Sequence, residues 1–259
     1  MDDLNTIDTL ERLEKYWRDF VLVFPWSTDL KEAVIASYPE LPYHEPNHAA
    51  NIDVEKKAAK NLLKSIIDHF KSAGSPVLWV RISPLTHPES FSSLLNENGF
   101  KQDFETCVMT FKGSQLKDSA PPKIRIEETS KRGLDGWKEL VCTIFGVPSE
   151  WSVGFDTYVA AYVDGGGRCY LAYLDDKPVG TCSLLSMNGS GGIFTIGTLE
   201  KYRRQGVGTA LTLHALRDSL SEGNTLHLLY VDKGDYAEHL YRRVGFEVHY
   251  TATWFIKEL

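Results

Sequence analysis

The fold of this chain is decided by Arg203-Arg204-Gln205-Gly206-Val207-Gly208. An apolar run from Ile193 to Leu199 precedes this stretch, and a helical pattern continues from it to about Ser221, which predicts a strand, a glycine loop and a helix. Glycines let the backbone approach a ligand closely, and the free N–H groups of a helix N-terminus attract negative charge. The stretch therefore predicts a binding site for a phosphate or pyrophosphate group.

The segments on either side of this loop alternate between strand and helix patterns. Before it, apolar spacing predicts a short strand at 124–126, a helix over 134–145, and a hairpin of strands 170–174 and 179–185. After it, we expect a strand over 226–231, a helix from about 235 to 245 and a final strand from 246 to 256. This order indicates a mixed α/β fold with a helix packed between strands.

The composition is that of a folded, acidic protein. The 259 residues are 42% hydrophobic and 24% charged, and the formal net charge is −7. A field of this sign repels nucleic acid and anionic lipid, so we expect no nucleic-acid or membrane partner, and any polyanion site must be local. No apolar run approaches the ~20 residues of a membrane span, and Met1 to Leu4 lack a signal-peptide pattern. We therefore expect a cytoplasmic protein.

Neither the cysteines nor one closely spaced pair of histidines predicts a metal site. His44 and His48 are four residues apart, but Pro46 argues against a helix that would direct both at one metal, and we expect a solvated loop there. The four cysteines lie far apart with no Cys-x-x-Cys pair, which favours reduced, buried thiols over a disulfide framework or a zinc site: Cys107, Cys142, Cys169 and Cys182. We expect no bound metal.

A boundary near the middle of the chain separates two predicted domains. The stretch from Lys112 to Lys123 offers little to a core, and its glycine and two prolines interrupt regular structure. We therefore predict an N-terminal domain over residues 1–115, a linker over 116–123 and a C-terminal domain over 124–259.

An internal repeat relates the two halves. Leu94 to Phe100 matches Leu240 to Phe246, and both end in a Gly-Phe pair followed by an apolar strand. Upstream, a helix, a glycine and a strand recur in the same order. The alternative is coincidence, because helices that end in glycine before a strand are common. At the position of the anion loop the first half has Val54 to Ala59, without glycine, so we expect only the second half to bind an anion.

Two segments together resemble the GNAT N-acetyltransferase superfamily. Thr198 to Leu211 is similar to the acetyl-CoA signature of that family, Arg/Gln-x-x-Gly-x-Gly/Ala, and Ala237 to Phe246 is similar to its closing helix. The resemblance extends from about Ile124 to Leu259. It implies the acyl-CoA N-acyltransferase fold, an α/β (α+β) architecture with a mixed, mostly antiparallel twisted sheet and helices on both faces. Together with the repeat, it implies two similar halves, of which the first is a degenerate GNAT-like domain without the CoA loop.

The resemblance also implies a cofactor site and a reaction. Acetyl-CoA would be the co-substrate, and its pantetheine arm would lie against the strand that ends in Ile196, Gly197, Thr198 and Leu199, whose N–H groups polarise the acetyl carbonyl. Tyr241 would protonate the departing thiolate, although an aromatic filling the space between helix and sheet is the alternative. The CoA pyrophosphate would lie against Arg203, Arg204, Gln205, Gly206, Val207, Gly208, Thr209 and Ala210.

The chain departs from the family pattern at two positions. Gly234 stands where members often have an asparagine, and Gly191 to Phe194 provide no glutamate where some members have their base. The sequence leaves open whether a water relayed by a hydroxyl or a carboxylate removes the proton from the amine, and the candidates are Thr195, Thr198, Tyr173 and Asp232.

The predicted reaction is direct transfer of an acetyl group to a primary amine of a small molecule or peptide in a ternary complex. The alternative is a non-catalytic acyl-CoA sensor or scaffold. We expect the N-terminal half to cover or shape the acceptor site. An aromatic stripe at helical spacing fits core packing, with an acceptor wall as the alternative: Trp151, Phe155, Tyr158 and Tyr162.

Overall fold

The computed structural model describes residues 2–113, 123–129 and 133–259, without the side chains of residues 2–6. The chain divides into two compact units, Met1–Cys107 with Tyr250–Leu259, and Val108–His249. It passes from one unit to the other within β5 (Lys101–Phe111) and within β11 (Phe246–Glu258). These crossings differ from the predicted linker, of which 116–122 lie outside the described residues. The predicted domain limits stay a prediction.

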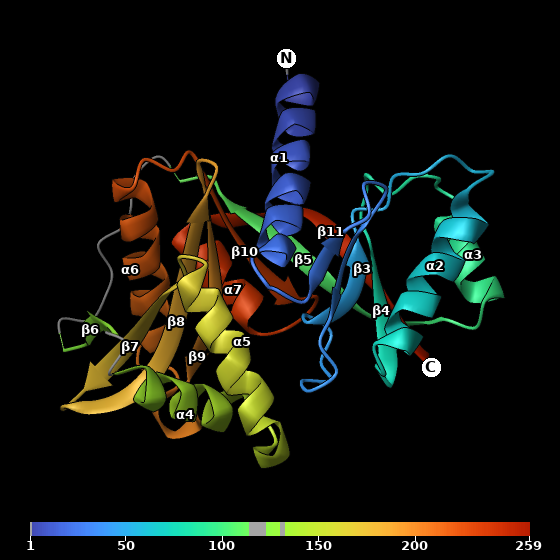
Figure 1. Ribbon diagram of the computed structural model, residues 1–259. Coiled ribbons are helices and arrows are strands. Elements are labelled where there is room, and N and C mark those ends of the chain that lie inside the picture. The colour runs from blue at the N-terminus through green and yellow to red at the C-terminus, as the bar shows by residue number, and fades with distance from the viewer. Residues whose placement is uncertain (1, 114–122, 130–132) are drawn as a thin grey trace. The chain divides into compact units, whose positions relative to one another are not determined.

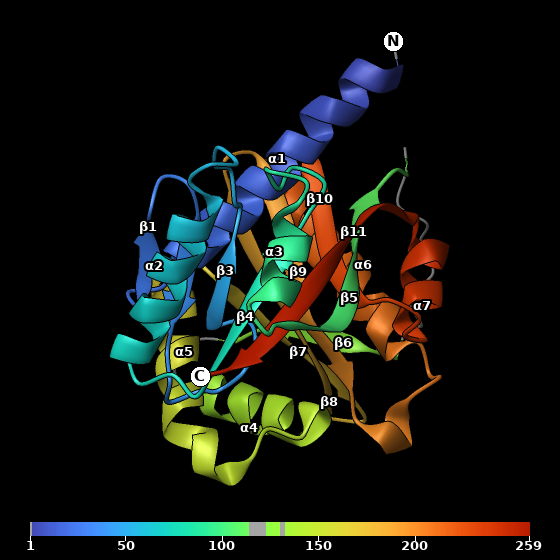
Figure 2. The ribbon, with the colours of Figure 1, turned by 90° about the vertical axis from the view of Figure 1, so that its right-hand side faces the viewer.

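Unit 1 holds a mixed sheet in the order β1-β2-β3-β4-β11. Strands β3 and β4 are parallel, and the other neighbours are antiparallel. Figure 2 shows β11 beside β4, where Thr253 to Glu258 pair with Ile82 to Val77. The elements are α1 (Asp2–Leu22), β1 (Ser27–Asp29), β2 (Val34–Ser37), β3 (Asn47–Ala50), α2 (Ala59–Ser72), β4 (Val77–Ile82) and α3 (Phe91–Glu97).

The core of unit 1 follows from the periodicity of α2. Leu63, Ile66 and Phe70 recur at helical spacing and are buried. They pack in one cluster with β4 residues of a single face, Leu78 and Val80. The same alternation directs the other residues of β4 to the opposite face of the sheet.

Unit 2 holds neighbouring strands in the order β10-β9-β8-β7-β6. Only β9 and β10 are parallel among these neighbours. The mixed, mostly antiparallel architecture expected from the sequence is confirmed. The elements are β6 (Arg125–Glu128), α4 (Leu134–Phe145), a short 3-10 turn (Ser149–Trp151), α5 (Ser152–Asp164), β7 (Arg168–Leu174), β8 (Lys177–Met187), β9 (Ser190–Thr198), a second 3-10 turn (Glu200–Tyr202), α6 (Val207–Ser221), β10 (Leu226–Asp232) and α7 (Ala237–Val244).

Helices cover both faces of this sheet (Figure 1). A Cβ built on Gly180 of β8 would lie 2.7 Å from Val207 Cγ1 of α6, whereas one on Gly197 of β9 would lie 2.6 Å from Ile144 Cγ2 of α4. Gly197 pairs with Thr181, the neighbour of Gly180, so the two glycines face opposite sides of the pleat. Helices α6 and α4 therefore lie on opposite faces of β8 and β9.

Both units contain the same sequence of pairings. In unit 1, β2 is antiparallel to β3, and β3 is parallel to β4 across α2; in unit 2, β8 is antiparallel to β9, and β9 is parallel to β10 across α6. Each parallel ladder stops early, at Ala49 and at Ile193. Two residues beyond each stop, Asn51 and Thr195 have positive φ values of 50° and 48°. These shared features support the predicted repeat.

None of the helices among the described residues has both the length and the apolar character needed to cross a membrane.

Candidate functional site

The predicted anion loop ends at the start of α6, where three N–H groups are not used by the helix. Gly206 precedes α6 with φ 86°, a left-handed conformation that glycine adopts without strain, and no side chain caps this end. The N–H of Ala210 donates to the carbonyl of Gly206 at 2.9 Å, as the first bond of the helix. The N–H groups of Val207, Gly208 and Thr209 precede that bond and so point out of the helix. With the helix dipole, they fit a bound anion.

Two arginines border these donors. Arg203 Nε donates to the carbonyl of Thr198 at 3.3 Å, and its guanidinium lies 5.9 Å from the ring centre of Tyr236. Arg204 has a φ of 61°, which turns the chain sharply before Gln205. Both arginines are exposed, so their charge is available to a ligand at the loop.

The loop lies beside the ends of β9 and α7. A Cβ built on Gly208 would lie 3.0 Å from Leu240 Cδ1 and 4.0 Å from Thr198 Oγ1. The structure thus brings the loop, the end of β9 and the closing helix together, although Tyr241 is separated from the loop by 33 residues of sequence or more. A side chain at position 208 would occupy space that the packing of α7 already fills.

Strands β9 and β10 separate toward this loop. Their parallel ladder runs from Ser190 with Leu226 to Ile193 with Leu229, but β9 continues to Thr198 and β10 to Asp232. No further pairs join the two strands in this fully described stretch. The separated main chains leave a place where an extended ligand can form the hydrogen bonds of a missing strand.

A β-bulge causes the separation. Thr181 pairs with Gly197 and Ser183 with Phe194, so one residue of β8 faces two of β9, Thr195 and Ile196. Thr181 Oγ1 donates to the carbonyl of Thr195 at 2.9 Å, and the hydroxyls of Ser183 and Thr195 are 2.7 Å apart. Polar groups of β8 therefore fix the bulge and the direction of the Ile196 main chain. Sequence reasoning missed this bulge, because neither Thr195 nor Ile196 carries a turn signal.

Tyr241 lies in α7 and is buried, with 5% of its surface exposed. Burial raises the pKa of its phenol above the usual value, and the nearby Cys182 thiol and Asp235 carboxylate act in the same direction. The hydroxyl therefore stays protonated at neutral pH. A protonated hydroxyl can donate to a leaving thiolate, and it equally suits a packed aromatic.

The residues of the aromatic stripe belong to two elements, α5 and the 3-10 turn before it. Phe155 and Tyr162 of α5 are buried, as core packing requires, whereas Trp151 belongs to the preceding 3-10 turn. The ring of Tyr162 lies 6.5 Å from that of Phe194, which stacks on Tyr230 at 5.9 Å. Aromatic rings from α5, β9 and β10 thus share one face of the sheet.

The expectation of a solvated loop at His44 and His48 is wrong for His48. This residue belongs to β3 and is fully buried. Its Nδ1–H donates to the carbonyl of Glu45 at 2.8 Å, and its Nε2 accepts from Trp17 Nε1 at 3.2 Å. Burial lowers the pKa of His48 to about 4, against the effect of the Glu45 carbonyl. His48 is buried by a tertiary contact, because Trp17 of α1 packs on it. The described residues contain no cluster of side chains suited to a metal ion.

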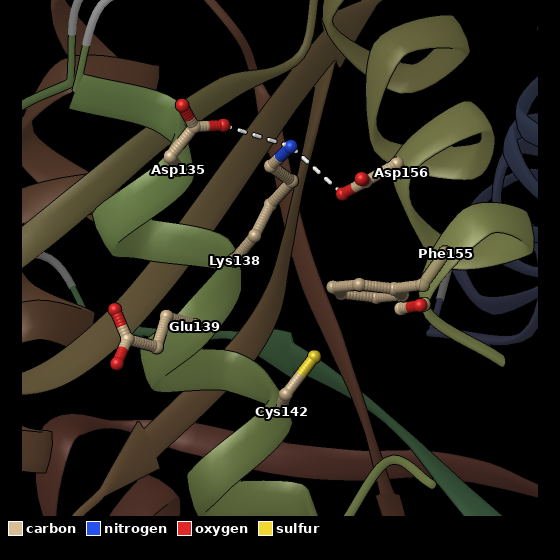
Figure 3. A pocket seen from close by; sticks show the side chains of 7 residues that line it. Asp135, Lys138, Glu139, Cys142, Phe155 and Asp156 are labelled. Atoms are coloured by element: carbon tan, nitrogen blue, oxygen red, sulfur yellow. Dashed lines mark ion pairs between the residues drawn. The ribbon is translucent and has the colours of Figure 1, made fainter. Parts of the chain in front are cut away.

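A cavity of about 240 Å³ lies between α4 and α5 (Figure 3). Lys138 Nζ lies between two carboxylates, 2.9 Å from Asp135 Oδ1 and 2.7 Å from Asp156 Oδ1. The thiol of Cys142 also lines the cavity, and burial raises its pKa. With Glu139 as a further carboxylate, the lining is net negative. It therefore does not suit the polyanionic CoA.

The comparisons with known proteins agree with this geometry. The model of the Acetyltransferase (GNAT) family matches residues 134–246. A search of curated proteins found no match.

Three solved structures show the same fold at low identity. A GCN5-related N-acetyltransferase from Kribbella flavida is 17% identical, with a TM-score of 0.74 over 96% of this chain and 95% of its own. One from Sphaerobacter thermophilus is 18% identical, with a TM-score of 0.65 over 88% and 76%. A tandem GNAT protein from the clavulanic acid biosynthesis pathway is 12% identical, with a TM-score of 0.60 over 82% and 75%. Residues 134–246 of this chain therefore match the Acetyltransferase (GNAT) family, and the solved structures share the fold.

Proposed function

We propose that this protein is an N-acetyltransferase that moves an acetyl group from acetyl-CoA to a primary amine of a small molecule or peptide. The observation that carries the proposal is the separation of β9 from β10, which leads to the free N–H groups at the start of α6. A long ligand that has an amide-bearing arm and a pyrophosphate fits both features, and CoA has both. The family match supports acyl transfer in general.

The donor would be held mainly by the main chain. The N–H groups of Gly206 to Thr209, with that of Gln205 nearby, would bind the pyrophosphate, and Arg203 and Arg204 would add charge at the rim. The N–H of Ala210, which the sequence also offers, already donates to the Gly206 carbonyl at 2.9 Å and would take no part. The pantetheine arm would pair with Ile196 to Leu199 along the open edge of β9.

The reaction needs two proton transfers. The amine nitrogen attacks the thioester carbonyl, a C–N bond forms, and the C–S bond breaks. N–H groups at the bulge, near Ile196, would stabilise the oxyanion. The CoA thiolate would take its proton from Tyr241, and the amine would lose one to a base.

We further propose that unit 1 has no donor site of its own. Its parallel ladder also stops early, but a buried ion pair fills the region beyond the stop: Arg81 Nη1 lies 2.9 Å from Glu14 Oε1. Asn51, at the position equivalent to the bulge residue of unit 2, donates to Glu14 Oε2 at 3.2 Å. Helix α2 begins after Ala58 in a right-handed conformation, without the open turn that a glycine provides.

Donor binding is tested by thermal shift with CoA. Wild type should be stabilised, by about 2.7 kcal/mol at a CoA concentration of 100 times the Kd. Gly206→Glu should abolish the shift, because bulk and negative charge exclude a pyrophosphate. Gly223→Glu is the matched control: Gly223 has φ 80° near the other end of α6, with no atom within 4 Å of a built Cβ. A CoA shift that survives Gly206→Glu would contradict the loop assignment.

Turnover is tested by thiol release from acetyl-CoA across a panel of primary amines. Amine-dependent release supports the enzyme, and mass analysis of the product identifies the acetylated nitrogen. CoA binding without release by any amine would instead support the sensor or scaffold. Equilibrium binding should give one CoA per chain, since two would contradict the proposal for unit 1.

A further inference from the structure

We infer that Asp232 is the catalytic base that takes the proton from the attacking amine. The inference rests on the proposed function and assigns the role that the sequence leaves open. Asp232 is the last residue of β10 and carries the only carboxylate on the two strands that separate, both of which the structure describes in full.

The side chain of Asp232 belongs to the face of the sheet opposite α6. His227 Nδ1 lies 2.8 Å from Ser219 Oγ of α6, so His227 points to that helix. Alternation along β10 then directs Tyr230 and Asp232 to the other face. The stacking of Tyr230 on Phe194 supports this direction for the Tyr230 side chain, and Asp232, two residues further along β10, points to the same face. Asp232 therefore lies on the aromatic side, away from the helix that starts at the anion loop.

Asp232 also lies at the level of the bulge along the strands. It is three residues beyond Leu229, where the ladder with β9 ends, which corresponds to about 10 Å of strand. On β9, Thr195 and Ile196 lie two and three residues beyond the partner of Leu229. The carboxylate thus faces the opening beside the N–H groups proposed to hold the acetyl carbonyl. It is solvent-exposed, so an amine can reach it.

The three hydroxyls that the sequence left open are less suitable. The Thr195 hydroxyl is engaged with Ser183 at 2.7 Å. Thr198 faces the α6 side, 4.0 Å from a Cβ built on Gly208. Tyr173 is on β7, two strands from β9, with the Arg125 guanidinium over its ring at 4.4 Å. None of the three is a carboxylate with access to the aromatic face.

The charged surroundings favour a carboxylate that accepts a proton more readily than usual. Burial of its inner part and the nearby Asp235 carboxylate raise the pKa of Asp232. The neighbouring β9 has no ionisable side chain, and α7 has Glu238 paired with Arg242 at 2.6 Å. Lys233 follows in the turn after β10.

The proton transfer is balanced within the reaction. As the nitrogen forms its bond to the carbonyl carbon, one N–H proton passes to a carboxylate oxygen of Asp232, directly or through one water. The C–S bond breaks, and the thiolate takes the Tyr241 proton. The two residues then exchange protons with solvent, which restores the enzyme.

The test compares Asp232→Asn with wild type from pH 5 to 9, using acetyl-CoA and the fastest amine of the panel. The ratio of the two kcat/KM values is followed, because ionisation of the amine is common to both enzymes and cancels. At pH 8 the variant should be slower by ~100-fold or more. The ratio should fall toward one as the pH drops through the pKa of Asp232, where wild type also loses its base.

A second variant separates catalysis from folding. Asp235→Asn removes the negative charge but keeps a side-chain oxygen. That oxygen can still accept the hydrogen bond that the Ala237 N–H donates to Asp235 Oδ1 at 2.7 Å. It should move the acid limb of the wild-type profile to lower pH, since the raised pKa falls when the like charge is removed. Asp175→Asn, in the exposed turn after β7, is the matched control and should leave the profile unchanged.

Three outcomes would overturn the inference. One is an Asp232→Asn variant that keeps more than half of the wild-type rate at pH 8. Another is a ratio of wild-type to variant kcat/KM that stays constant with pH, although the variant still shows the CoA thermal shift. Either leaves the proposed function standing. Absence of turnover by wild type with every amine would instead refute the proposed function, and the base assignment with it.

Discussion

The buried ion pair of unit 1 provides a quantitative test of the structure. Arg81 has a fully buried side chain, and its Nη1 donates to both carboxylate oxygens of Glu14 at 2.9 and 3.1 Å. Its Nη2 donates to the Tyr250 hydroxyl at 2.9 Å, and the guanidinium lies 4.6 Å from the ring centre of Trp17. The perturbation is Arg81→Met, which keeps most of the volume and removes the charge.

The expected loss follows from the carboxylate that remains. Glu14 is 4% exposed, so among the described side chains the donors left to its charge without Arg81 are the Tyr250 hydroxyl and the Asn51 amide. Removing one partner of a buried pair costs about 3–5 kcal/mol. Glu14→Gln should cost a similar amount, because it leaves the guanidinium without a countercharge. The double variant should lose far less than the sum, since Gln still accepts from Tyr250 and Asn51 and no charge is left buried.

Urea unfolding followed by tryptophan fluorescence measures these losses, because Trp17 reports on the site directly. The three variants and wild type form a double-mutant cycle, with an expected coupling energy of about 3 kcal/mol or more. Additive losses, or a loss under ~1 kcal/mol for Arg81→Met, would refute the buried geometry. Tyr250→Phe keeps both charges and removes only the hydroxyl that bonds to them, so it should cost about 1.5–3 kcal/mol, less than the loss of either charged partner.

Three further predictions concern single residues. His48 should contribute about 3 kcal/mol to a fall in the free energy of unfolding as the pH drops from 6.5 to 4, because the unfolded chain protonates His48 before the folded chain does; His44, whose pKa burial lowers to about 3, adds to the same fall, so urea titrations at several pH values should show a smaller fall for His48→Gln, and an unchanged fall would contradict the burial. Gly191→Ala should lower the urea midpoint, with a loss of ~1–3 kcal/mol, because its Cβ would lie 1.9 Å from Ser219 Oγ; an unchanged midpoint would speak against this packing. Tyr241→Phe should slow thiol release, and because the pKa of the wild-type phenol is raised, wild type should lose no activity through ionisation of this phenol up to about pH 10; equal rates for both enzymes at every pH would exclude the general acid.

Local signals predicted most elements of unit 2. The helix expected over 134–145 is observed with the same limits, because its apolar spacing and Gly146, which has φ 67°, define both face and end. The hairpin also formed as expected, through a tighter two-residue turn at Asp175 and Asp176, which both have positive φ. The glycine loop and the start of α6 follow from Gly206 and Gly208 themselves.

Long-range features of the candidate site had no such signal. The bulge at Thr195 depends on hydroxyls of β8, and the face of Asp232 depends on the register of β9 and β10. Periodicity predicts that a strand exists but not which strand pairs with it or where the ladder stops. The choice among the four candidate bases therefore needed the paired sheet.

The sequence by itself determined the anion loop, the order of helices and strands, the family resemblance and the repeat, because glycine conformation and apolar spacing act over a few residues. Only the tertiary structure decided how those elements are used. It buried His48, made the end of β11 pair with β4, and joined Glu14 to Tyr250 across 236 residues. The physical reason is that burial, strand register and ion pairing depend on groups that the chain brings together only when it folds.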